Sequence, residues 1–416
     1  MKKTFFLLIT LVLVIIGCGQ KGQEFYDKGL AKYKLKDYTG AIAEYTKAIK
    51  LDSSYVAAYN QRGLAKSNLQ AISDLNKFTA DELDDIADFN RAIEIDSMFE
   101  EAYFNRGKVW SKFWFARSQA IDDFTKAIVI NPKYKEAYYE RGCVKFNLND
   151  GAGAIDDFTK AIEINPKYKE AYSNRGLAKM NLNDYAGAIV DLSKAIGIDQ
   201  KYANAYINIG LAYSRQNDFK SAIANYNKAI ELDSNDAITF FNRGCVKSQL
   251  ENYNDAIVDY TLAIKLDPKF VQAYRNRAKS KNELQDFSGA IADYSKAIEL
   301  KPEDADFYFS RGFEKNNIQD YFGAVEDFDK AINIDPKLAD PYFFRGNIRL
   351  TAKNFIGAIN DYTRVIEIDP EHSNSYYNRG LAKLKLGQNE NGCLDLRKAG
   401  ELGCSEAYEL IRKYCQ

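Results

Sequence analysis

The chain of 416 residues contains one histidine, seven prolines and two tryptophans. The single histidine, His372, has no neighbouring set of ligands, which excludes a histidine-based metal cluster and a Ser-His or Cys-His catalytic centre. The sequence also lacks the motifs G-x-S-x-G, G-x-x-x-x-G-K-[ST] and H-E-x-x-H. We therefore predict that the chain is not an enzyme and uses neither a metal nor another cofactor.

Neither sign of charge is in excess along the chain. There are 57 Lys and Arg residues against 58 Asp and Glu, which gives a formal net charge of −1 at pH 7. Nucleic-acid binding draws its affinity from the neutralisation of phosphates and needs a basic surface. The balance of charge therefore predicts that the chain has no nucleic-acid partner.

The N-terminal apolar run, Phe5–Ile16, is too short to cross a membrane but suits the core of a signal peptide. It follows two lysines and ends in Ile-Ile-Gly-Cys18, which resembles a bacterial lipobox. The resemblance implies a signal peptide over 1–17, acylation of Cys18, a short linker over 18–24 and a lipid anchor in the bacterial envelope. Gly19 after the cysteine mildly favours the outer membrane. The alternative is an ordinary signal peptide followed by an incidental cysteine.

A glycine recurs every 34 residues through most of the chain, and the frame defines eleven repeats. A fixed period of this length indicates a solenoid, in which each repeat buries its apolar face against its neighbours. Each repeat holds two segments with apolar residues at helical spacing, which we name helix A and helix B. An Asp or Asn before helix B should cap it, and a proline usually follows it. The frame positions are Gly29, Gly63, Gly107, Gly142, Gly176, Gly210, Gly244, Ala278, Gly312, Gly346 and Gly380.

This pattern resembles the tetratricopeptide repeat. The shared features are the period, an aromatic four residues before the glycine, an alanine twelve after it, and the terminal proline, as in Tyr138, Gly142, Ala154 and Pro166. The resemblance implies an all-α, right-handed superhelical solenoid over residues 25–403, with helix A lining the concave side. The alanine should face the glycine and let the two helices approach closely. A capping helix is expected over 404–416.

Two charges depart from the family pattern. An arginine precedes the glycine, and an acid stands fifteen residues after it. Repeat six lacks both, since it has Ile209 and Asn225. A partly buried charge without a partner is costly, so the joint loss predicts ion pairs within each repeat. The alternative is a cationic track for a ligand. The pairs singled out are Arg243 with Asp259, Arg277 with Asp293, and Arg311 with Asp327.

The resemblance also implies a ligand surface on helix A, at positions three before, one after and four after the glycine. Aromatics there offer contact area at low entropic cost, and nearby asparagines can grip a peptide backbone. The alternative is that these side chains pack between successive A helices. The aromatic candidates are Tyr26, Phe104, Tyr139, Phe146, Phe241, Phe309, Phe313, Phe343 and Tyr377. The asparagine candidates are Asn174, Asn208, Asn242 and Asn276.

Repeat two carries an insertion near residues 70–80, and repeat three holds both tryptophans. Trp110 and Trp114 are four residues apart and should share a helix face. With Phe113 they form a candidate contact patch. The alternative is that Trp110 packs in the core and the insertion is a tolerated loop.

Three cysteines lie in the last repeat and its cap. If the cap folds back antiparallel, Cys415 lies nearer to Cys393 than Cys404 does, and a Cys393–Cys415 disulfide can form in an oxidising compartment. The alternative is that all three are packed thiols.

These features together predict a lipid-anchored scaffold that binds a protein or peptide partner at the bacterial cell envelope. The alternatives are an envelope assembly lipoprotein, acting on an outer-membrane or secretin complex, and cell-wall glycan binding through the concave aromatics.

Overall fold

The computed structural model describes residues 20–70 and 80–415, and within these ranges the elements are α-helices and one 3₁₀ turn. The predicted signal peptide, Cys18 and most of the insertion of repeat two lie outside the described residues. The described chain forms two compact bodies, an N-terminal body ending at Ala212 and a C-terminal body starting at Tyr213.

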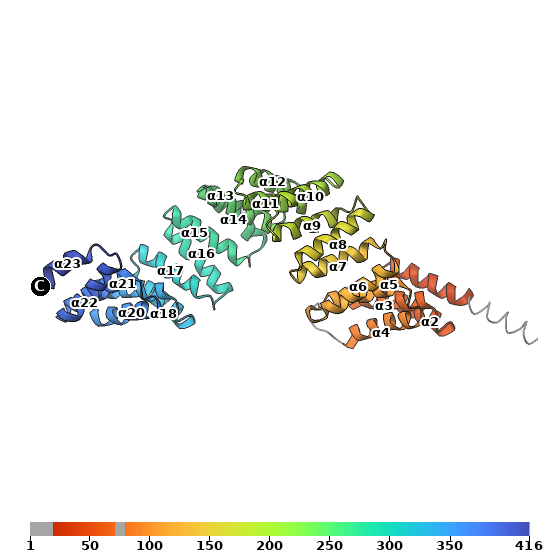
Figure 1. Ribbon diagram of the computed structural model, residues 1–416, viewed down its shortest axis with the longest axis horizontal. Coiled ribbons are helices and arrows are strands. Elements are labelled where there is room, and N and C mark those ends of the chain that lie inside the picture. The colour runs from red at the N-terminus through yellow and green to blue at the C-terminus, as the bar shows by residue number, and fades with distance from the viewer. Residues whose placement is uncertain (1–19, 71–79, 416) are drawn as a thin grey trace, which may run out of the picture. The chain divides into compact units, whose positions relative to one another are not determined.

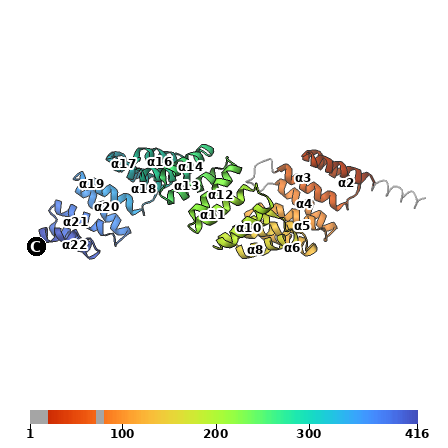
Figure 2. The ribbon, with the colours of Figure 1, turned by 90° about the horizontal axis from the view of Figure 1, so that it is seen from above.

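Helices A and B alternate in sequence, and within each body consecutive helices lie side by side (Figures 1 and 2). The first repeat consists of a helix over 20–34 followed by α2 (Tyr38–Leu51). The rest of the N-terminal body contains α3 (Val56–Gln70), α4 (Ala80–Ile95), α5 (Glu100–Ser111), η1 (Trp114–Ala116), α6 (Arg117–Ile130), α7 (Lys135–Asn147), α8 (Gly151–Ile164), α9 (Lys169–Asn181), α10 (Tyr185–Ile198) and most of α11 (Ala203–Arg215).

The C-terminal body continues the same alternation. Its helices are α12 (Phe219–Leu232), α13 (Ala237–Gln249), α14 (Tyr253–Leu266), α15 (Val271–Glu283), α16 (Phe287–Leu300), α17 (Ala305–Asn317), α18 (Tyr321–Ile334), α19 (Ala339–Thr351), α20 (Phe355–Ile368), α21 (Ser373–Lys385), α22 (Asn389–Glu401) and α23 (Ala407–Tyr414). The predicted all-α class and its paired helices are confirmed.

Two local features form the turn between helices A and B. The residue before the cap adopts a left-handed conformation, as Asn149 does at φ 63°. The carboxylate of Asp150 then accepts a hydrogen bond from the backbone N–H of Gly153 at 2.9 Å, which satisfies one of the free amides that open α8. The same cap recurs at Asp37, Asp184, Asp218, Asp286, Asp320 and Asn354. Asn252 is the exception, because its side chain makes no cap bond and donates to Asp255 instead.

The repeat glycine allows a close approach, but in most repeats the nearest residue is an aromatic of helix B and not the predicted alanine; at Gly176 the backbone oxygen of the predicted Ala188 does lie close, 3.3 Å from a Cβ placed there. A Cβ placed on Gly142 would lie 2.8 Å from Cε1 of Phe158, which is closer than carbon atoms can pack. The ring on helix B therefore fills the space that the missing side chain leaves. Ala154 is fully buried nearby and does not make this closest approach. Gly244 and Gly312 meet Tyr260 and Phe328 in the same way.

The linker expected over 18–24 is partly helical, because the first helix already begins at residue 20. Contacts one helical turn apart account for the early start. Gln23 Nε2 donates to Asp27 Oδ1 at 2.9 Å, and Lys28 Nζ lies 2.6 Å from Glu24 Oε1. Tyr55 OH also donates to Gln23 Oε1 and joins this helix to the second repeat.

The C-terminal helix α23 closes the last repeat. Ala407 is buried in a cluster with Leu396, against which Leu410 and Ile411 pack. A disulfide between Cys393 and Cys415 joins α22 to the end of the chain, with 5.6 Å between the Cα atoms. Cys404 is a buried free thiol. In the described part of the chain, no helix combines the length and apolar character that crossing a membrane requires.

Candidate functional site

In the repeats that carry both, the arginine and the acid form an ion pair at the junction of helices A and B, whereas repeat six has Ile209 and Asn225 at these positions. Arg243 donates from Nε and Nη2 to the two carboxylate oxygens of Asp259, at 2.9 and 2.6 Å. Asp259 is 0 % exposed, and Lys247 Nζ lies 2.8 Å from its Oδ2. The predicted pairs of Arg277 with Asp293 and Arg311 with Asp327 are also present, each with a lysine as second cation.

The lysine beside each of these ion pairs was not predicted, although it recurs three residues after the glycine. It extends the pair into an Arg–Asp–Lys triad, and each arginine also stacks on the aromatic three residues before it, as Arg243 does on Phe240. These contacts occupy the guanidinium groups and disfavour a free cationic track. The other cations at the lysine position of a triad are Lys66, Lys145, Lys179, Arg349 and Lys383.

Repeat three lacks the second cation because Trp110 stands at the lysine position. Asp123 there pairs with Arg106 at 2.6 Å, and in the described part of the chain no lysine forms a second ion pair with it. Burial raises the pKa of the Asp123 carboxyl above its usual value, and Arg106 opposes this shift. In repeat three the apolar packing of Trp110 therefore replaces the ion pair that the lysine makes in other repeats.

The predicted contact patch of repeat three is divided between core and surface. Trp110 packs against buried Phe89 and Val109, with Phe113 beside it. Helix α5 ends at Ser111, because the chain tightens into i→i−3 hydrogen bonds at Lys112 and Phe113. Trp114 therefore lies in η1 and is 79 % exposed. The prediction that Trp110 and Trp114 share a helix face is wrong.

Most of the predicted aromatic ligands on helix A are half-buried and pack in the seams between repeats. Phe104 contacts Phe124 of its own repeat at 5.8 Å between ring centroids, and Tyr134 of the next repeat at 4.8 Å. The residue eight before the glycine, which sequence reasoning missed, supplies the third ring. Equivalent trios are Tyr26, Tyr45 and Tyr55; Tyr139, Phe158 and Tyr168; Phe241, Tyr260 and Phe270; and Phe343, Tyr362 and His372.

Two further aromatic candidates are also used in packing. Phe146 lies against buried Ala154 and Phe158, and Tyr377 packs in the cluster that α23 closes. For these residues the interpretation as inter-repeat packing describes the structure better than an open ligand surface.

The asparagines two residues before the glycine join neighbouring repeats. Asn174 Nδ2 donates to Tyr139 OH at 2.9 Å and lies 3.3 Å from Cys143 Sγ, and Asn276 lies 3.3 Å from Cys245 Sγ. Burial, helped by Glu140, raises the pKa of the Cys143 thiol to about 11. Asn208 and Asn242 occupy the same register and are half-buried.

One part of the A-helix surface differs from every seam described above. Phe309 and Phe313 on α17 meet Phe343 and Phe344 on α19 and form a continuous group, which we name the phenylalanine cluster. Phe344 lies at its centre, 5.8 Å from Phe309, 5.2 Å from Phe313 and 5.5 Å from Phe343 between ring centroids. All four rings are half-buried, so part of each remains accessible. Phe344 was not predicted, because its register carries asparagine in most other repeats.

Polar groups adjoin the phenylalanine cluster. Asn347 Oδ1 accepts hydrogen bonds from Tyr362 OH at 2.8 Å and from Asn378 Nδ2 at 3.0 Å, which fixes the amide plane. Asn317 Nδ2 donates to Glu314 Oε2 at 3.2 Å. Burial raises the pKa of the Glu314 carboxyl. His372 caps α21, because its Nδ1 accepts a hydrogen bond from the backbone N–H of Ser375.

The described residues contain no group of three or more His, Cys, Asp or Glu side chains that could hold a metal ion. The site is therefore a surface of rings and amides, whose chemistry is contact and hydrogen bonding.

Family models of the tetratricopeptide repeat match through much of the chain. Models described as "Tetratricopeptide repeat" match residues 135–168, 203–236, 237–270, 339–372 and 361–392. A model described as "TPR repeat" matches residues 29–70, 179–217 and 279–317. No curated protein matches the sequence.

Several solved structures are similar to the chain. YrrB, described as a TPR protein with an unusual peptide-binding site, is 25% identical with a TM-score of 0.40, and the match covers 44% of this chain and 95% of YrrB. A tetratricopeptide repeat protein from Parabacteroides merdae is 20% identical with a TM-score of 0.43, over 60% of this chain and 99% of that one. PilF of Pseudomonas aeruginosa is 19% identical with a TM-score of 0.42, over 49% and 92%. These scores are low, and the family rests on the repeat models.

Proposed function

Because the chain belongs to the tetratricopeptide-repeat family, we propose that it is a scaffold that binds an extended, apolar segment of a partner protein at the phenylalanine cluster. The matching models describe this repeat and no catalytic domain. Binding, without catalysis, is the activity we assign to the chain.

The observation that carries the proposal is the continuity of the four rings. At the other seams a single aromatic of helix A is enclosed by a ring on helix B and one of the next repeat. At the cluster, Phe313 and Phe344 add two more rings that the seam does not need. The accessible parts of these half-buried rings supply contact area at low entropic cost, which suits the apolar side chains of a bound segment.

The amides beside the rings suit the backbone of the same segment. A carboxamide nitrogen can donate to a backbone carbonyl of an extended peptide while its oxygen is held by other donors. Two hydrogen bonds to its oxygen hold Asn347 in place, and they also fix the direction in which its amide nitrogen points. A preorganised donor of this kind costs little entropy on binding.

The predicted lipid anchor is part of the proposal. Cys18 stands two residues before the first helix, so acylation there would keep repeat one close to the bilayer surface. The Cys393–Cys415 disulfide is consistent with an oxidising compartment such as the bacterial envelope. We propose a lipid-anchored protein of the cell envelope, with the outer membrane favoured by Gly19.

A phage-displayed library of random peptides tests the binding surface. The double variant Phe313→Leu and Phe344→Asn places at both positions the residues that other repeats use there, as Leu177 and Asn174 do in repeat five. We expect the wild-type chain to select peptides rich in apolar side chains and the variant to bind them at least tenfold more weakly. Trp114→Ala, at an exposed ring of the other body, serves as the matched control and should leave binding unchanged.

Equal binding by the wild-type chain and the double variant would contradict the assignment to the cluster. Selection of no peptide, together with retention on isolated cell wall, would favour the glycan alternative. Capture of a barrel or secretin protein would favour the assembly alternative.

The anchor is tested separately by labelling bacteria that produce the chain with radioactive palmitate. We expect label and membrane fractionation for the wild-type chain and neither for Cys18→Ser. Label that persists in the Cys18→Ser variant would contradict acylation at this residue.

A further inference from the structure

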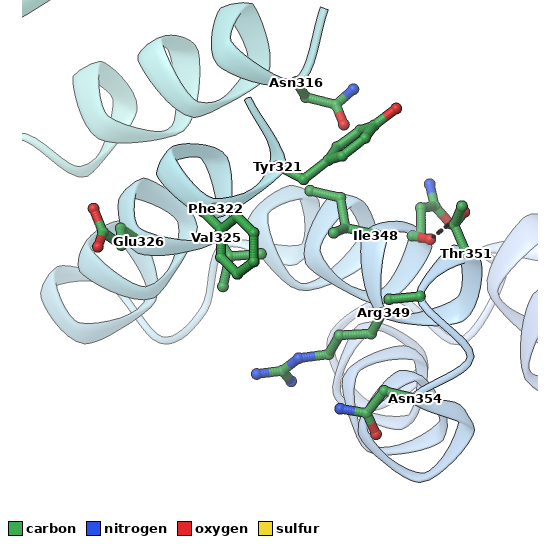
Figure 3. A pocket seen from close by; sticks show the side chains of 11 residues that line it. Asn316, Tyr321, Phe322, Val325, Glu326, Ile348, Arg349, Thr351 and Asn354 are labelled. Carbon is green, nitrogen blue, oxygen red and sulfur yellow. Dashed lines mark hydrogen bonds between the residues drawn. The ribbon is translucent and has the colours of Figure 1, made fainter. Parts of the chain in front are cut away.

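A cleft of about 630 Å³ opens between repeats nine and ten of the C-terminal body, and Asn347, which adjoins the phenylalanine cluster, also lines it. Its walls come from the start of α18 and the end of α19, and include Tyr321, Phe322, Val325, Ile348 and Ala352. Figure 3 shows Phe322 and Val325 on α18 on one side, with Ile348 and Arg349 on α19 on the other. The cleft is large enough to receive side chains from another molecule.

The cleft exists because one repeated side chain is missing. Six residues after the glycine most repeats carry a leucine, and that leucine covers the first turn of helix B in the preceding repeat. A Cβ on Gly151, the first residue of α8, would lie 3.3 Å from Cγ of Leu182. Ala352 holds the leucine position of repeat ten and lines the cleft together with Tyr321, the first residue of α18. The leucines at this register are Leu35, Leu69, Leu148, Leu182, Leu250, Leu284 and Leu386.

A second departure from the repeat lies on the rim of the same cleft. The second residue of helix B is small or polar in most other repeats, but in repeats nine and ten it is Phe322 and Ile356. Phe322 is 90 % exposed and Ile356 is 66 % exposed. Because the ring of Phe322 is so exposed to water, burying it against an apolar surface would be favourable. The polar or small residues at this register are Thr39, Ser118, Ala152, Ala186, Lys220, Asn254, Ser288 and Glu390.

We propose that this surface pairs two copies of the chain about a two-fold axis, with Phe322 of each copy filling the cleft of the other. The surface carries both an unfilled apolar hole and an unburied apolar side chain, which is the self-complementarity that an isologous contact needs. Its charges are of both signs, since Glu326 and Arg349 line the same cleft. Arg349 pairs with Asp361 through Nη1 at 2.8 Å, and its remaining donors can meet Glu326 of the second copy.

The size of the surface sets the strength of the contact. Phenylalanine buries on the order of 150–250 Å², so the two Phe322 rings together bury about 300–500 Å². The walls around them must supply the rest of the roughly 1,200 Å² at the lower end of stable interfaces. The pairing is therefore weak and reversible, with a dissociation constant in the micromolar range.

Sedimentation velocity of the full chain in a mild detergent tests the proposal, with the protein mass corrected for bound detergent. We expect the wild-type mass to rise from one chain to two as concentration increases through the micromolar range. Phe322→Ser removes the ring, and Ala352→Leu fills the cleft with the side chain that other repeats carry. Each should weaken pairing at least tenfold, and Ala352→Leu should do so without loss of thermal stability.

Val258→Ser is the matched control, because it removes an exposed apolar side chain from helix α14 of the same body, where no such cleft is lined. It should dimerise as the wild-type chain does. A wild-type chain that stays monomeric up to the highest concentration overturns the proposal. Dimerisation that survives both Phe322→Ser and Ala352→Leu overturns it as well, and so does an equal loss of pairing in Val258→Ser.

Discussion

At the scale of single residues, the buried carboxylate that most repeats share is the group that most needs charged partners. Asp259 of α14 is fully enclosed and receives two charged partners from α13, Arg243 and, one turn further along that helix, Lys247. Removing one partner of a buried pair leaves a charge without compensation. Each repeat that has a triad therefore depends on it.

A double-mutant cycle on Arg243 and Asp259 measures this dependence. We expect Asp259→Ala to lower the free energy of unfolding by about 3–5 kcal/mol, and the cycle to give a coupling on the order of 1–3 kcal/mol. The exposed pair Lys296–Glu299, 2.6 Å apart, is the control, and its coupling should stay below about 1 kcal/mol because solvent screens it. Equal couplings for the two pairs would contradict the structural role of the triad.

The raised pKa of Asp123 predicts a dependence on pH. The folded chain holds this proton more tightly than the unfolded chain, so the contribution of Asp123 to stability is complete below its ordinary value of 3.8 and is lost as pH rises through the folded pKa. The stability advantage of the wild-type chain over Asp123→Asn should therefore shrink as pH rises from about 4 to about 7. Urea unfolding followed by Trp110 fluorescence in a Trp114→Phe background reports on this repeat. An advantage that grows with pH would mean that the pKa is lowered.

At the scale of elements, helix B of each repeat relies on its N-cap. Asp286 accepts from the backbone N–H of Gly289 at 2.9 Å, whereas Asn252 makes no such bond at the same register. We expect Asp286→Ala to cost about 1 kcal/mol, within the usual range for a lost cap, and Asn252→Ala to cost clearly less. Hydrogen exchange of the first turns of α16 and α14 provides the readout. A cost as large for Asn252→Ala would show that the side-chain cap does not stabilise helix B.

The disulfide holds helix α23 in place, and few other contacts do so. Helix α23 has eight residues and packs through a few side chains on the last repeat. Closing the loop between Cys393 and Cys415 should contribute about 2–4 kcal/mol to holding α23 in place. We expect Cys393→Ser to speed proteolytic cleavage within residues 403–416, with Cys404→Ser as the control that leaves the rate unchanged. Similar rates for both variants would contradict a stabilising bond.

The elements that sequence reasoning could place are those fixed by local physics. Periodic apolar residues and capping residues such as Asp150 predict helix pairs, and the joint loss at Ile209 and Asn225 predicts the ion pairs. The elements it misplaced depend on contacts across space. The end of α5 at Ser111, which separates Trp110 from Trp114, follows from how Phe113 packs, and no local signal announces it.

The candidate site was predictable only in part for the same reason. Register alone placed Phe309, Phe313 and Phe343 on helix A, but it could not distinguish a ring enclosed in a seam from one that stays accessible. That distinction depends on Phe344 and on the ring eight residues before each glycine. Both are visible only once neighbouring repeats are in contact.

At the scale of the whole molecule, the principal contacts within each body join elements that follow one another or are separated by one helix. Residues that most repeats share, such as the triads and the N-caps, hold the array together. Residues that depart from the repeat, such as Phe344 and Phe322, are the ones we assign to binding. A chain built in this way should respond to damage locally, because its stability is a sum of repeats and nearest-neighbour interfaces.

Hydrogen exchange of the Asp259→Ala variant, resolved by peptide, tests this modularity most directly. The account predicts faster exchange in α13–α16, around the broken triad, and unchanged protection in α3–α9 of the N-terminal body. A loss of protection spread evenly over both bodies would show that distant repeats fold as one unit, and it would contradict the account.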